Sequence, residues 1–172
     1  MLGIWQDIVG ILMLALALAS VLALLGLSVG AWTGSLADLL FTWLGWGAVL
    51  FPVSIGLISL VLLARSFGWL DHVKWRRVIA LELSAVFLLG LVHLALAAEL
   101  AKDHGISQSD VLAGRQLLLH AVAGQGGGKV GWAVVLLASS ALPRSPVLLL
   151  ALLFTISSVY GLGMSWKLVF EP

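Results

Sequence analysis

The sequence predicts an all-α integral membrane protein, a helical bundle with four transmembrane helices and one short re-entrant or interfacial helix. Hydrophobic residues make up 62% of the 172 residues, and charged residues only 10%. The mean hydropathy is +1.15. A globule of this length cannot bury so much apolar surface, so lipid must solvate it. Four apolar runs are long enough to cross a hydrocarbon core of roughly 30 Å.

The first predicted span covers residues 8–29 and carries no charge. The residues before it include no lysine or arginine, and the run is longer than the apolar region of a signal peptide, so we expect it to be retained.

The second span covers residues 36–64. Asp38 lies near its start, where the helix dipole favours a carboxylate, so we interpret it as a capping residue. Pro52 lacks a backbone donor, and with Gly45 and Gly47 nearby a kink is expected between Trp46 and Pro52.

A basic segment at residues 65–77 separates the second and third spans. Short loops rich in lysine and arginine stay in the cytoplasm, so with four spans both termini are expected to be cytoplasmic. Trp69 and Trp75 are expected at the level of the lipid headgroups. The charged residues and the histidine of the segment are Arg65, Asp71, His72, Lys74, Arg76 and Arg77.

The third span, residues 78–98, contains two ionisable residues, Glu82 and His93. Their separation of eleven positions places them within about 20° of one helical face but roughly 16 Å apart. Ionisable residues inside a membrane often line ion paths, which would make the chain a small transporter or channel subunit. Snorkelling of Glu82 toward the basic segment, or pairing with it, is the simpler interpretation. A stand-alone membrane scaffold is a third alternative.

The next segment, residues 99–128, is mixed in character and is predicted to be an extracytoplasmic loop. It is expected to contain one amphipathic helix between Ser109 and Ala123, with Ser107 or Ser109 as its cap. The apolar stretch at residues 129–142 is too short to span and forms the re-entrant or interfacial helix. Prolines then break it, and the last predicted span covers residues 147–166.

The sequence predicts no catalytic, cofactor-binding or metal site, no enzyme activity and no small-molecule substrate. A phosphate-binding loop ending at Lys129 would need glycine at position 123 and serine or threonine at 130, but the chain has Ala123 and Val130. The net charge of +1 argues against direct binding of nucleic acid. There is no cysteine for a thiolate site, and metal-ligand spacing is missing among the four histidines, His72, His93, His104 and His120.

Small residues recur at four-residue intervals at Gly26, Gly30 and Gly34. Such spacing allows helices to approach closely in a membrane. The spacing alone leaves open whether these contacts form within one subunit or between subunits.

With this order of elements, the chain resembles the four-helix N-terminal membrane domain of the FtsK/SpoIIIE family of DNA translocases. The resemblance covers nearly the full length. It rests on Gly30–Phe41 (GAWTGSLADLLF), followed by Leu44–Ala48 (LGWGA) and Pro52, on Gly127–Gly131 (GGKVG), and on Gly161–Trp166 (GLGMSW).

The resemblance implies a membrane anchor in the bacterial inner membrane, located at the division septum and linked to cell division and chromosome partition. It also implies a homo-oligomer, because the motor of the family forms a hexameric ring, and it implies other division proteins as partners. The family's ATP-driven motor would lie outside this sequence, which contains no Walker A motif. The segment itself would contact the lipid bilayer and carry out no catalysis.

Overall fold

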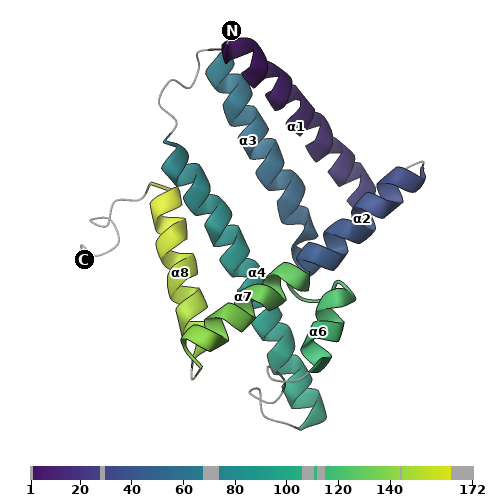
Figure 1. Cartoon of the computed structure of the whole chain (residues 1–172), viewed down its shortest axis with the longest axis vertical. Helices are drawn as coiled ribbons and strands as arrows, with labels where there is room; N and C mark the ends of the chain where they lie inside the picture. Colours follow the sequence, from purple (N-terminus) through teal and green to yellow (C-terminus); the bar gives the residue numbers. More distant parts are fainter. Residues whose placement is uncertain are drawn as a thin grey trace. The chain divides into compact units, whose positions relative to one another are not determined.

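The computed structural model describes residues 2–27, 30–67, 74–105, 111, 115–143 and 145–163, and the regular secondary structure among them is entirely helical (Figure 1). The chain forms two compact units, the first of Met1–Leu40 and Ala48–Trp75, the second of Phe41–Gly47 and Arg76–Pro172. The helices are α1 (Leu2–Leu24), α2 (Ala31–Leu44), the 3₁₀ helix η1 (Gly45–Val49), α3 (Leu50–Ser66), α4 (Trp75–His104), α6 (Arg115–Val122), α7 (Gly128–Ala141) and α8 (Pro146–Gly161).

Three helical stretches of the described chain are long and apolar enough to cross a membrane: Ile4–Leu24, Gly34–Ser66 and Trp75–Asp103. The pair α7 and α8 also passes this test together, with a bend of 112° between the two helices. The prediction of an all-helical protein with several membrane-spanning helices is therefore confirmed. Among the described residues the candidate spans number three, or up to four if the bent pair counts as one.

In the first unit, α1 and α3 pack side by side in antiparallel order (Figure 1). A Cβ added at Gly10 would lie 3.0 Å from the Leu63 side chain, and one at Gly56 would lie 3.8 Å from the Cβ of Ala17. The buried hydroxyl of Ser59 donates a hydrogen bond of 2.7 Å to the carbonyl of Gly10. Small residues and one interhelical hydrogen bond therefore hold this pair together, as is usual where lipid removes the hydrophobic driving force.

The predicted second span is interrupted by η1, and α2 and α3 run in different directions (Figure 1). Gly45, at the start of η1, has a φ of +58°. Pro52 is the third residue of α3, in the first turn, where a helix needs no backbone donor. The break therefore comes from the Gly45 backbone and the 3₁₀ turn, not from a donor missing in mid-helix.

The interpretation of Asp38 as a capping residue is wrong. Helix α2 begins at Ala31, five residues before the predicted start of the span, and Asp38 lies exposed in its middle. The first turn of α2 contains no acidic residue. Alanine and tryptophan continue the apolar pattern upstream, so the helix extends past the position at which a cap was expected.

In the second unit, α4 is longer than the predicted span at residues 78–98 and extends through Glu99–His104, which were predicted to be loop. Most of these added residues are good helix formers. Buried Ala101 and half-buried Leu100 also pack against Leu117 of α6 and against Val111. Packing thus continues the helix beyond the apolar run. Helix α6 falls inside the predicted amphipathic segment, while Ser107 and Ser109 lie outside the described residues.

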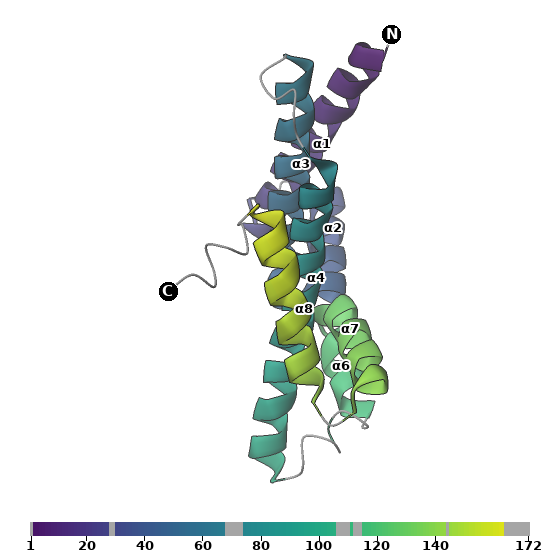
Figure 2. The same ribbon diagram turned by 90° about the vertical axis from the view of Figure 1, so that its left-hand side faces the viewer.

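Helices α7 and α8 pack on α4 (Figure 2). Val135 and Ala138 of α7 share a buried cluster with Leu94 of α4 and Leu150 of α8. Further along, a Cβ at Gly161 would lie 2.7 Å from Cγ of Leu81. Because α8 contacts earlier residues of α4 as it proceeds, the two helices are antiparallel. The final residues of the predicted last span, 164–166, lie outside the described residues.

The glycines at positions 26, 30 and 34 do not serve packing within the described chain. A Cβ added at any of the three would meet nothing within 4 Å. Gly26 has a φ of +68° and follows the last turn of α1, a common place for glycine. The described residues therefore give no intramolecular contact for this repeat, and contact between subunits stays a prediction.

We expect Ser59→Ala to lower the free energy of unfolding by about 0.6 kcal/mol, the average for an interhelical hydrogen bond in a membrane protein. The substitution leaves the Gly10 carbonyl without its partner. Reversible unfolding in mixed detergent micelles measures the change. Ser54→Ala, at a half-buried serine of the same helix, is the control and should unfold like the unmodified protein. Equal stability of both variants would contradict a stabilising Ser59–Gly10 hydrogen bond.

Candidate functional site

The best-organised polar region of the described chain is a loop between α6 and α7. Residues 124–131, which include the first turn of α7, read GQGGGKVG, and five of the eight are glycines. This loop packs against residues 41–47 and against α4, all within the second unit. We call the loop, Gly45 and His93 the glycine junction. No group of three or more histidine, aspartate or glutamate side chains suited to holding a metal occurs among the described residues.

On one side of the junction, the loop contacts the turn at Gly45. The backbone N–H of Trp46 donates a hydrogen bond of 2.7 Å to the carbonyl of Gly126. A Cβ at Gly45 would lie 2.2 Å from that same oxygen and 2.5 Å from the nitrogen of Gly128. Gly45, Gly126 and Gly128 all have φ near +60°, which glycine adopts without strain. Both geometry and space therefore require glycine here.

On the other side, the loop lies directly on the backbone of α4. A Cβ at Gly127 would lie 2.1 Å from the carbonyl oxygen of Leu89, and one at Gly131 would lie 2.7 Å from the same atom. Neighbouring Gly90 is equally close to α7, with Val134 2.6 Å from its virtual Cβ. The start of α7 thus meets α4 at backbone distance.

His93 is the polar side chain at the centre of the junction, and it is 0% exposed. Its Nδ1 accepts a hydrogen bond of 3.3 Å from the N–H of Gly127. An imidazole that accepts through Nδ1 carries its proton on Nε2 when neutral. Among the described residues Nε2 has no hydrogen-bond partner. The side chain therefore helps satisfy the loop backbone through one nitrogen and leaves the other unpaired.

Lys129, the residue that suggests a phosphate-binding loop, lies over an aromatic ring. Its Nζ is 5.3 Å from the ring centroid of Trp43, the distance of a cation–π interaction. The space beside the glycines before Lys129 is occupied by atoms of α4 and of the turn at Gly45. This loop therefore packs against the protein and offers no backbone cradle for a phosphate.

The two ionisable residues of the third predicted span have different surroundings. His93 is enclosed by the glycine junction, whereas Glu82 is half-buried on the part of α4 nearer the basic segment. An apolar pocket beside α4 is lined by neither residue. Of the other histidines, His120 pairs through Nδ1 with Oε1 of Gln125. His72 and the side chain of His104 lie outside the described residues.

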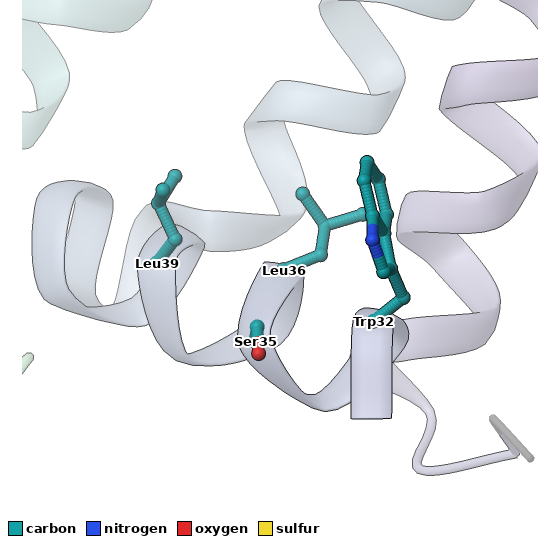
Figure 3. Close-up of a pocket in the computed structure, with 4 residues that line it drawn as sticks. All are labelled: Trp32, Ser35, Leu36 and Leu39. Atoms are coloured by element: carbon teal, nitrogen blue, oxygen red, sulfur yellow. The ribbon is translucent and has the colours of Figure 1, made fainter. Parts of the chain in front are cut away.

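A second pocket, of about 390 Å³, lies against one face of α2 in the first unit. Figure 3 shows the indole of Trp32 beside the side chain of Leu36, with Leu39 further along the helix. Ser35 also borders it. Apart from this hydroxyl and the indole N–H of Trp32, the described lining residues are apolar. None of these residues is titratable, so they form no catalytic constellation.

Sequence reasoning singled out Gly127–Gly131 and Gly45 separately but did not predict that they meet. The available signal was the density of glycines in two segments about 80 residues apart. A membrane chain has few reasons to place so many glycines outside its spans unless backbones approach closely. His93 was singled out as an ionisable residue of a span, but its role as acceptor for the loop was not anticipated.

No family model matches this chain, and no curated protein or solved structure is significantly similar to it.

We expect Gly127→Ala to lower the free energy of unfolding by about 1–3 kcal/mol, the usual cost of forcing an extra group into a packed interior. Gly127 has a negative φ of −86°, so the effect tests crowding against Leu89 and not backbone strain. Gly34→Ala is the matched control, because its new Cβ meets nothing within 4 Å. Unfolding in mixed micelles measures both. A Gly127 variant as stable as the control would show that the loop does not pack on α4.

Proposed function

We propose that this chain is the membrane anchor and oligomerisation domain of a DNA translocase that acts in cell division and chromosome segregation. The main support is the resemblance to the FtsK/SpoIIIE membrane domain together with one structural observation. Two segments that carry the resemblance, Leu44–Ala48 and Gly127–Gly131, are far apart in sequence but pack against each other in the glycine junction. Most glycines of these two segments are therefore ones that the packing requires.

The contacts of the first unit support a cytoplasmic amino terminus. Gly10 of α1 lies beside Leu63 of α3, near the end of α3 that carries Arg65. The beginning of α1 is therefore on the same side as the basic segment. Because basic short loops stay in the cytoplasm, this arrangement fits the topology of the proposed anchor.

The contacts of the second unit support the same side for the end of α8. Its last residue, Gly161, packs on Leu81, and a Cβ at Gly163 would lie 2.6 Å from Cζ of Arg77. Helix α8 therefore returns to the basic end of α4. A motor that follows this segment would then begin in the cytoplasm, where chromosomal DNA is.

Oligomerisation is supported by exposed glycines beside which the described chain leaves open space. Gly30 and Gly34 are exposed, and their virtual Cβ positions are open. Gly34 lies on α2 and Gly30 directly precedes it, and small exposed residues suit close contact with another copy in the membrane. The proposed anchor would use this face to gather subunits.

The topology can be tested directly, because the chain contains no cysteine. We expect a Lys102→Cys variant to react with a membrane-impermeant maleimide in intact cells, because Lys102 is exposed at the far end of α4. A Lys74→Cys variant, exposed at the basic end, should react only after permeabilisation. The reverse pattern would invert the topology and overturn an anchor for a cytoplasmic motor.

The proposed cellular role predicts location. A fluorescent protein fused to the carboxyl end of the full-length chain should gather at midcell in dividing bacteria. The Gly127→Ala variant is expected to lose this localisation to the extent that it loses folded protein. Gly34→Ala is expected to fold normally, because its Cβ meets nothing within 4 Å. Any loss of its midcell signal would therefore report on assembly and not on folding. A fusion spread evenly around the membrane would contradict the division role and leave the transporter or scaffold alternatives.

A further inference from the structure

An apolar groove lies in the second unit where α4, α7 and α8 meet. Val86 and Phe87 of α4, Leu137 and Ala141 of α7, and Leu149 and Leu153 of α8 line it. It has a volume of about 360 Å³ and is open on one side. We propose that this groove binds one acyl chain of a bilayer phospholipid and holds it more tightly than the surrounding lipid.

The depth of the groove supports this occupant. Arg77 marks the basic end of α4, which belongs at the headgroup level. Phe87 follows ten residues later, about 15 Å along the helix axis and near the middle of a core of roughly 30 Å. Ala97 lies about 30 Å from Arg77 by the same measure. Trp132 packs on the cluster that contains Ala97, which suits the aromatic belt of the opposite interface.

The chemistry of the walls excludes water. A space of this size has room for about twelve water molecules at about 30 Å³ each, but a buried water needs two to four polar partners. Every lining side chain among the described residues is apolar. The serine hydroxyls at the end of α7 already donate within their own helix, Ser139 to the Val135 carbonyl and Ser140 to the Leu137 carbonyl. These donor hydrogens are therefore not offered to water in the groove. At this depth the remaining medium is hydrocarbon.

The shape of the site explains why one chain would be retained. Helices α7 and α8 meet at 112°, so α7 forms a wall across the groove and α8 a wall along it. An acyl chain lying against α4 in this corner contacts three helices at once, whereas a chain on an ordinary helix face contacts one or two. Each additional buried contact adds dispersion attraction. The inference requires only that the chain is in a membrane, and it does not depend on the proposed role in DNA translocation.

The test is to reconstitute the full chain in vesicles of phosphatidylethanolamine and phosphatidylglycerol, with a phospholipid carrying a diazirine in the middle of its acyl chain. After a detergent wash that removes loosely held lipid, irradiation should still label lining residues of α4, α7 and α8. Ala141→Phe fills the groove from an exposed position, and we expect it to reduce this labelling about tenfold, which corresponds to about 1.4 kcal/mol. Ala141→Leu should give a smaller loss.

Ala133→Phe is the matched control, because Ala133 is an exposed alanine of the same helix that does not line the groove. It should keep the labelling of the unmodified protein, and circular dichroism should show equal helix content in all variants. Equal labelling of Ala141→Phe and Ala133→Phe would overturn the proposal. So would crosslinks from the groove to a second copy of the chain in place of lipid. Native mass spectrometry that finds no retained phospholipid on the unmodified protein would also overturn it.

Discussion

The structure of the second unit depends on one constraint, the need to satisfy and bury irregular backbone close to a membrane. A loop that leaves a helix within the hydrocarbon region carries N–H and C=O groups that lipid cannot pair. In this chain the loop before α7 is pressed against other backbone, with Trp46 N–H bonded to Gly126 and His93 Nδ1 accepting from Gly127. Only glycine permits such distances, because a single Cβ at position 127 would lie 2.1 Å from a carbonyl of α4.

The consequences of this contact extend to α7 and α8. Because the loop is held on α4 at Leu89, α7 begins beside α4 and contacts it at Gly90 through Val134. Its Ala138 then joins the cluster with Leu150, which sets where α8 starts its antiparallel course. A loose loop would leave α7 without a defined position and would remove one wall of the apolar groove. Thus a polar contact of a few atoms determines the form of an apolar site.

Among the described residues of the first unit, no irregular loop needs to be buried between α1 and α3. Helices α1 and α3 satisfy their own backbones, so their association requires only close approach and one added hydrogen bond. Gly10 permits the close approach, and Ser59 donates the hydrogen bond. The exposed apolar residues around this pair, such as Leu12 and Leu57, do not conflict with this design, since lipid is their solvent. Stability here comes from fit between small residues and not from removal of apolar area from water.

The sequence by itself determined the class of the protein and the approximate position of most helices, because apolar runs, prolines and charges report directly on transfer into lipid. It did not determine where α4 ends, since Ala101 and Leu100 become helical through packing on Leu117, a contact distant in sequence. It also placed Asp38 at a helix start that lies several residues earlier. The candidate site was visible only as separate glycines and one histidine. Their meeting was decided by tertiary structure, because close approach between backbones leaves no periodic or chemical signal in either segment alone.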